Sequence, residues 1–289
     1  MKILIAIPHV FNPIQDSNYS SNDQSKKSLK INALINSTQG NLIRHGKNHF
    51  VHASKGLYTE VFTRMLESQG GNDIKIQLFT PKAATLSPYI SKSNHIEIIE
   101  PELNYLGSEE YTQIPLLASQ RLLEQANEYD IVCYMEDDLL IEDRDFFSKL
   151  LYLDSQSDGS MAFMPHRCEY IPAKGDVILS GDPDGGRPDL FWDTGEKFQV
   201  EWPLGNQIFY RATNPHSGCY FLTKRQALKV KSYWLDRKWI ADYELSGPLE
   251  QAGSGLLLPV LKIMKPLPSQ YRFFMVQHLD ELWKRHPFE

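Results

Sequence analysis

The ten residues YDIVCYMEDD, numbered 129–138, place three acids directly after an unbroken apolar run. The run, residues 131–135, is typical of a central strand in a parallel sheet, because helices cover both faces of such a strand and no polar alternation is needed. In open α/β sheets, ligands bind beyond the carboxyl ends of the strands. The acids Glu136, Asp137 and Asp138 therefore follow the predicted strand at the place where such a fold would bind a ligand.

Strand and helix patterns alternate in the part of the chain before this stretch. Residues 3–7 are apolar, residues 74–79 alternate with a period of two, and residues 96–99 form another short apolar segment. Helices are expected over residues 57–66 and over residues 114–126, and the second of these leads directly into the apolar run. This alternation predicts an α/β fold.

Past residue 138 the strict alternation ends. The pattern predicts a helix over residues 143–153, a strand near Met161, a strand over residues 219–222 and a helix over residues 225–234. The stretch 171–206 is rich in Gly, Pro and Asp and is long for a plain connection. Such long segments in compact domains are often binding loops, so we expect one here.

Residues 12–30 are almost entirely polar and contain several turn-forming residues. This composition is typical of a loop. A surface loop is the favoured interpretation, and a lid over a binding site is the alternative.

Composition and charge narrow the function classes. The net charge of −6, from 30 basic and 36 acidic residues, provides no basic surface for a polyanion, so we expect no nucleic-acid partner. The cysteines Cys133, Cys168 and Cys219 are odd in number and widely spaced, which favours a reducing compartment over a disulfide framework. No segment approaches the roughly 18 apolar residues of a membrane span, and the apolar start ends at Pro8. We expect a cytoplasmic protein, and peripheral membrane contact stays open.

The three adjacent acids favour a metal site. Neighbouring carboxylates repel one another, and placing them at the end of a buried strand costs stability unless a cation offsets them. Mg²⁺ or Mn²⁺ would do so and would also bridge the oxygens of a diphosphate. In an extended segment Glu136 and Asp138 should face the same way and Asp137 elsewhere. The alternative is helix capping, although Glu142 and Asp143 already stand at the next helix start.

The stretch 129–138 resembles the D-x-D segment of GT-A nucleotide-sugar glycosyltransferases, in an E-D-D form. Residues 214–222, NPHSGCYFL, resemble the glycine-bearing strand that follows the acceptor loop in that family. The resemblance implies a GT-A fold, which is a Rossmann-like, mixed but mostly parallel sheet flanked by helices. It implies that Asp138 binds Mn²⁺ or Mg²⁺, that Glu136 contacts ribose or the metal, and that Asp137 helps to bind the donor. Glu in place of Asp at the first position leaves the role of Glu136 open.

The resemblance also implies a third metal ligand and a catalytic base. GT-A enzymes commonly complete the metal shell with a late histidine, and His278 is the best match by order and by its apolar lead-in, with His286 as competitor. Inverting members use a carboxylate base, for which Glu250 is the candidate, with Asp242 and Glu244 in reserve. The alternative for Glu250 is structural: Gly247 would cap a helix that begins at Pro248, and the third helical residue is a usual place for an acid.

Further candidates concern the donor and the acceptor sugar. Pro8 and His9 follow the first strand, and Arg121 borders the apolar face of its helix, so these residues are placed as donor contacts, with a solvated surface role as the alternative. Trp192 and Trp202 offer faces on which a sugar ring would stack, with a core role as the alternative.

The sequence therefore predicts one GT-A domain over residues 1–289, with a nucleotide-sugar-binding half at 1–138 and an acceptor-binding half at 139–289. The expected activity is transfer of a sugar, of the hexosyltransferase type, from a nucleoside-diphosphate sugar to a hydroxyl of a glycan or lipid-linked acceptor. One alternative is a nucleotidyltransferase, which would need a Gly-rich, basic loop where residues 7–12 read IPHVFN. The other is a catalytically silent carbohydrate-binding relative.

Overall fold

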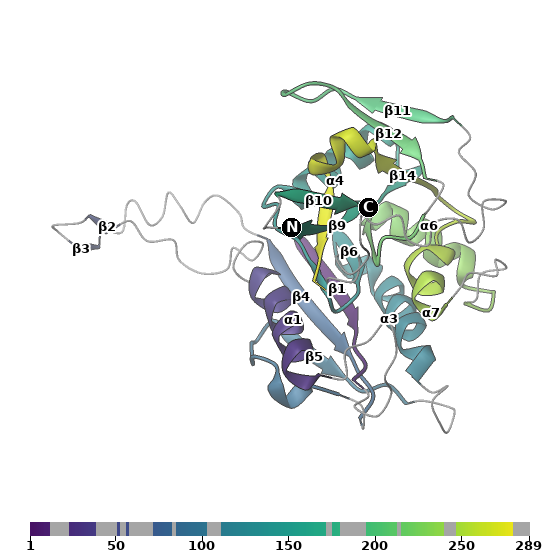
Figure 1. The fold of residues 1–289 in the computed structure, drawn as a ribbon. Helices are drawn as coiled ribbons and strands as arrows, with labels where there is room; N and C mark the ends of the chain where they lie inside the picture. The colour runs from purple at the N-terminus through teal and green to yellow at the C-terminus, as the bar shows by residue number, and fades with distance from the viewer. Residues whose placement is uncertain are drawn as a thin grey trace, which may run out of the picture.

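The structure of the chain is a computed structural model (Figure 1). It describes residues 1–11, 23–38, 51–52, 56–57, 72–82, 85–102, 111–171, 175–179, 195–212, 215–239 and 247–279. The helix predicted over residues 57–66 lies outside these ranges, apart from its first residue.

A five-stranded sheet forms the centre of the fold. Its strands, in spatial order, are β13 (Cys219–Thr223), β6 (Ile131–Met135), β1 (Lys2–Pro8), β4 (Asp73–Phe79) and β5 (Ile96–Ile99). Strand β13 runs antiparallel to β6, and the other neighbours are parallel. The predicted α/β fold with a mixed, mostly parallel sheet is therefore confirmed. All residues of β6 are buried, as its unbroken apolar sequence predicts.

Helices cover both faces of this sheet, and Figure 1 shows α1 (Gln24–Ser37) and α3 (Gln113–Glu124) on opposite sides of it. Side chains alternate between the two faces with the period of two that strands impose. Odd-numbered residues of β1 and β6 pack with α1 and with α4 (Phe146–Ser157). Even-numbered residues of both strands pack with α3 and with α6 (Lys224–Trp234).

Two further sheets come mainly from the second half of the chain. The first has the order β10 (Asp176–Leu179), β9 (His166–Ile171), β15 (Met275–His278) and β7 (Leu139–Leu140). The second has the order β11 (Lys197–Val200), β12 (Gln207–Arg211), β14 (Lys262–Pro266) and β8 (Met161–Phe163). The first of these sheets adjoins the acidic triplet, because β7 begins directly after it.

The remaining elements are short. They are the antiparallel pair β2 (Val51–His52) and β3 (Gly56–Leu57), the 3₁₀ helices η2 (Ser87–Tyr89), η4 (Ala126–Glu128) and η6 (Pro268–Phe273), the helix α7 (Pro248–Glu250) and the π-helical turn η5 (Gln251–Gly255). Within the described ranges, no helix is both long and apolar enough to cross a membrane.

Three element predictions are corrected. The loop predicted over residues 12–30 is helical from Gln24, because the Asp23 side chain accepts from the backbone N–H groups of Ser25 and Lys26 and caps the helix. The helix predicted from residue 143 begins at Phe146. The stretch 171–206 contains β10 and β11 rather than loop alone, and most of the residues between these two strands lie outside the described part.

Candidate active site

The acidic triplet lies where the strand order of the central sheet reverses. The chain runs outward from β1 through β4 to β5 and then returns to place β6 on the other side of β1. In open α/β sheets this switch point, at the carboxyl ends of the strands, is where ligands bind. Residues after β1 and after β6 meet there, because the two strands are parallel neighbours.

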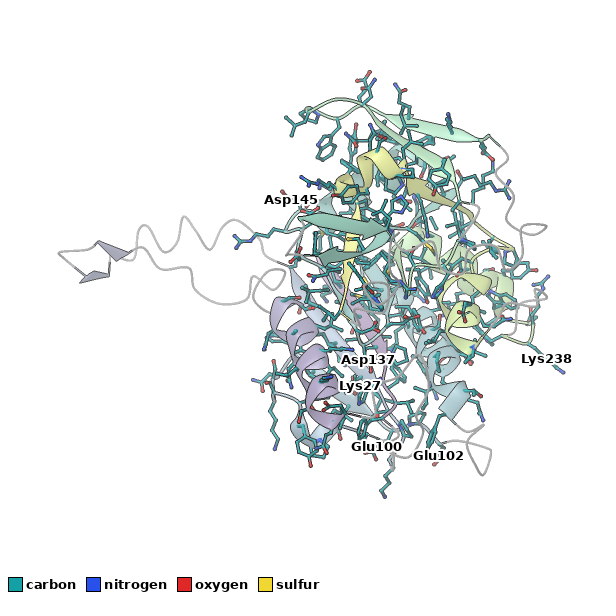
Figure 2. The ribbon with its side chains drawn as sticks, viewed as in Figure 1. Lys27, Glu100, Glu102, Asp137, Asp145 and Lys238 are labelled. Atoms are coloured by element: carbon teal, nitrogen blue, oxygen red, sulfur yellow. The ribbon has the colours of Figure 1, made fainter. Side chains whose placement is uncertain are left out.

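Asp137 links the ends of β1 and β6 to α1. Its Oδ2 lies 2.6 Å from His9 Nδ1 and 3.3 Å from Lys27 Nζ, and Figure 2 shows Lys27 beside Asp137. The backbone N–H of Leu86 donates to His9 Nε2 at 3.1 Å, so the ring proton is on Nδ1 and is donated to Asp137. Burial would raise the pKa of Asp137, but Lys27 and the hydrogen bond from His9 outweigh it and lower the pKa.

His9, predicted as a donor contact, is thus fully buried with both ring nitrogens bound within the protein. Its neighbour Pro8 is the buried last residue of β1. Both residues are therefore buried at the carboxyl end of β1.

Asp138 faces His278, the histidine that the resemblance implied as a metal ligand. Asp138 Oδ2 lies 3.3 Å from His278 Nε2, and His278 Nδ1 lies 2.7 Å from Glu169 Oε1. The antiparallel pairing of β15 with β7, which matches His278 with Leu139, brings the histidine to the triplet. The backbone N–H of Leu279 also donates to the Asp138 carbonyl oxygen at 2.9 Å.

The charges of this pair shift both pKa values. Burial would raise the pKa of Asp138, but the charge and hydrogen bond of His278 and the nearby Arg167 lower it well below its usual range. Burial would lower the pKa of His278, but Asp138 and Glu169 together raise it.

Glu136 contacts a different pair of side chains, Arg167 and His216. Its Oε2 lies 3.4 Å from Arg167 Nη1, and its Oε1 lies 3.4 Å from His216 Nε2. The charge of Arg167 also lowers the pKa values of Asp138 and His278. Arg167 therefore acts on both Glu136 and Asp138, the two acids that were predicted to face the same way. Within the triplet, Asp137 alone contacts His9 and Lys27 in the described structure.

Gly218 permits the close approach of Glu136. Its φ of +68° is a conformation that L side chains rarely adopt, and a Cβ at this position would lie 2.9 Å from Glu136 Oε2. The Glu136 N–H donates to the Gly218 carbonyl oxygen at 2.9 Å. The glycine of the sequence HSGCYF is therefore required by both the backbone and the triplet.

Glu250 lies at the start of a helix, as predicted, and its charge acts on Tyr134 in β6, the strand that leads into the triplet. It is the third residue of α7, with Gly247 as N-cap and Pro248 at the first helical position. A Cβ on Gly247 would lie 2.7 Å from Glu250 Oε2, so the carboxylate turns back toward its own helix start. Burial, and the charges of Glu136 and Glu250 among others, raise the pKa of Tyr134 well above its usual value.

Two other predicted residues that the structure describes, Arg121 and Trp202, are not brought to the triplet. Arg121 lies in the last turn of α3, pairs with Glu124 and has 67% of its side chain exposed. Because α3 ends just before β6 begins, Arg121 lies toward the start of that strand. Trp202 packs edge-on against Tyr152 and Phe273, which supports the core role. The remaining candidates, Asp242, Glu244, His286 and Trp192, lie outside the described residues.

Several site residues were missed from the sequence: Lys27, Arg167, Glu169 and His216. Arg167 and Glu169 stand at alternate positions of β9, and both are buried. Charged residues repeating with a period of two in a short strand are a signal that would have found them. Lys27 gives no comparable signal, because it is one of several lysines in a polar segment.

A divalent ion such as Mg²⁺ or Mn²⁺ needs several oxygen or nitrogen ligands. In the ranges that the structure describes, no group of three or more His, Cys, Asp or Glu side chains is arranged to hold a metal ion. The Asp138 and His278 pair still offers a carboxylate and an imidazole, and Asp138 Oδ1 is buried without a hydrogen-bond partner among the described residues. Mg²⁺ is usually bound by one or two carboxylates together with water and substrate phosphates, so the pair fits an ion shared with a ligand.

No protein-family model matches the chain, and no curated protein is significantly similar to it. Because α/β folds host many unrelated activities, the function is inferred from the chemistry of the site itself.

We predict that Gly218→Ala destabilises the protein more than Gly175→Ala does. Both glycines have a positive φ, which costs an alanine about 1–2 kcal/mol, but a Cβ at Gly175 would meet nothing within 4 Å. The methyl group at position 218 would also displace the Glu136 carboxylate. Urea unfolding of the two variants measures the difference, and equal losses would contradict the packing role of Gly218.

We also predict that the Asp138 and His278 pair makes the stability of the metal-free protein depend on pH. The pKa of His278 is raised from 6.5, so its contribution is fully present below pH 6.5 and is lost as the pH rises through the raised value. The pKa of Asp138 is lowered from 3.8, so its contribution is present above pH 3.8 and is lost as the pH falls. The pair therefore stabilises the fold most between these limits.

This dependence is measurable as the difference in unfolding free energy between the wild type and His278→Gln, in EDTA. The wild-type advantage should shrink as the pH rises from about 6.5. A difference that stays constant up to about pH 9 would show that the pair carries no such linkage.

Proposed function

We propose that the chain is a metal-dependent glycosyltransferase of the GT-A type, which moves a sugar from a nucleoside-diphosphate sugar to a hydroxyl of a glycan or lipid-linked acceptor. One observation carries the proposal: Asp138, the last acid of the E-D-D triplet at the switch point of the sheet, faces His278 at 3.3 Å. The mixed sheet, with β13 antiparallel to β6, is compatible with this fold family.

Asp138 and His278 would hold the divalent ion, Mn²⁺ or Mg²⁺. When bound, the ion would act as a Lewis acid that stabilises the departing diphosphate. Asp138 would supply a carboxylate oxygen, and His278 would supply Nε2 after losing its proton. Asp137 would have a separate role, because its hydrogen bond with His9 and its ion pair with Lys27 fix the edge on which the donor would lie.

We assign Glu136 to positioning the Arg167 guanidinium rather than to binding the metal. Its two carboxylate oxygens face Arg167 and His216, which hold it to the wall of the site. The Arg167 guanidinium, within electrostatic range of Asp138 and His278, would stabilise the negative charge of the donor diphosphate. A fixed cation of this kind costs no reorganisation when the diphosphate departs.

For the acceptor, Glu250 is our candidate base in an inverting mechanism. Burial raises the pKa of the Tyr134 hydroxyl, and the charges of Glu136, Glu250 and Asp137 raise it further, so Glu250 is within electrostatic range of the same buried group as two acids of the triplet. A retaining mechanism would not need a base at this position. The reserve candidate Asp242 lies outside the described residues.

Donor binding is tested by thermal unfolding with UDP-, GDP-, CMP- and dTDP-sugars, in Mn²⁺ and in EDTA. A ligand at about 100 times its dissociation constant should add about 2.7 kcal/mol of stability. We expect a shift for one nucleotide class that EDTA abolishes and that Asp138→Asn abolishes. Asp145→Asn is the matched control, because Asp145 is exposed and lies well away from Asp137 (Figure 2).

The other outcomes separate the alternatives. Absence of any nucleotide-sugar shift would contradict the proposal and favour a silent carbohydrate-binding relative. A shift for nucleoside triphosphates alone would favour a nucleotidyltransferase.

The role of Glu250 is tested by Glu250→Gln in a transfer assay. Loss of a general base should lower the turnover rate by about 10²- to 10⁴-fold while the donor-induced thermal shift is kept. If the Glu250 charge only stabilises the start of α7, turnover should persist and only the unfolding free energy should fall, by about 0.3–1 kcal/mol. Measuring turnover and stability on the same preparation separates the two roles.

A further inference from the structure

We propose that Glu169 is a positioning residue, which orients the His278 ring so that Nε2 is presented to a metal ion shared with Asp138. The inference rests on the proposed function, because it assumes that a divalent ion binds between Asp138 and His278. It adds a residue that the sequence did not indicate.

The backbone pairing of β9 with β15 brings Glu169 and His278 together. Strands β9 and β15 are parallel, and their register matches Met275 with His166 and Gln277 with Cys168. One residue further along both strands, His278 comes beside Glu169. The contact distance of 2.7 Å between Nδ1 and Oε1 follows from backbone pairing rather than from a mobile loop.

The hydrogen bond fixes which ring nitrogen faces the site. A carboxylate only accepts hydrogen bonds, so the Nδ1 atom of His278 carries a proton and donates it to Glu169. The other nitrogen, Nε2, then lies 3.3 Å from Asp138 Oδ2. Metal-binding histidines usually donate their second ring N–H to a carboxylate in this way, which fixes the tautomer and raises the basicity of the ligand.

Glu169 is buried, so its charge lowers the stability of the fold unless its contact with His278 and other partners offset the loss of hydration. Its side chain is only 1% exposed, and a buried carboxylate costs several kcal/mol unless cations and donors compensate. A purely structural bridge between β9 and β15 would also explain this burial. The two explanations differ in what Glu169 does to metal affinity.

Mn²⁺ titration of the intact chain, followed by the electron paramagnetic resonance of free Mn²⁺, tests the proposal. Glu169→Gln keeps the size of the side chain but removes its charge, and we expect about 10- to 100-fold weaker Mn²⁺ binding. Glu142→Gln is the matched control, since Glu142 is exposed but its charge reaches Cys168 in β9, and its Mn²⁺ affinity should be unchanged.

The outcomes distinguish this inference from the proposed function. A folded Glu169→Gln variant that binds Mn²⁺ as tightly as the wild type would overturn the positioning role and leave the metal site intact. A wild type that binds no Mn²⁺ would overturn the metal site and the positioning role together. Urea unfolding in EDTA establishes for each variant that the affinity is measured on folded protein.

A second measurement needs no Glu169 variant. In ¹⁵N NMR of the wild type with Zn²⁺ as a diamagnetic stand-in, His278 should be protonated at Nδ1 and coordinated through Nε2. His278→Gln identifies its signals among those of the nine histidines. Coordination through Nδ1, or an ion that leaves the His278 signals unchanged, would overturn the proposal even if Glu169→Gln failed to fold.

Discussion

Charge compensation at the end of β6 is the constraint on which the rest of the structure depends. Burying several carboxylates together is strongly unfavourable unless each has a partner. Each acid of the triplet finds its partner on different elements: Asp137 on β1 and α1, Asp138 on β15, and Glu136 on β9 and just before β13. The central sheet and the sheet of β7, β9 and β15 are therefore joined by the same charges that form the candidate site.

Sequence patterns predicted the elements better than the contacts between them. The apolar runs of β6 and of the first strand and the apolar stripe of α3 are local sequence patterns, and the Gly247-Pro248 pair is a local helix-start signal, so all four elements could be predicted. The start of α1 was missed because it depends on the Asp23 cap and not on apolar periodicity. The partners of the triplet lie more than 100 residues away in several cases, as in His9 with Asp137, and such pairing depends on sheet order and register.

The candidate site draws residues from both predicted halves of the chain. Asp138 ends the predicted first half, whereas His278, Glu169 and Arg167 come from the second. The pairing of β15 with β7 places His278 beside the triplet. A ligand bound between Asp138 and His278 would therefore also link β15, near the end of the described chain, to the end of β6 in the central sheet. A ligand that binds only this arrangement would stabilise both sheets at once.

The same compensation explains how two buried carboxylates lie on either side of His278. His278 lies between the two acids, with Nε2 3.3 Å from Asp138 Oδ2 and Nδ1 2.7 Å from Glu169 Oε1, and both carboxylates raise its pKa. Metal binding requires a neutral imidazole, so a divalent ion would replace one proton and leave the site more positive by one charge. In the proposed reaction a nucleoside diphosphate supplies negative charge at that place, with Arg167 and Lys27 nearby. Ion and donor should therefore bind better together than separately, because each offsets the charge that the other brings.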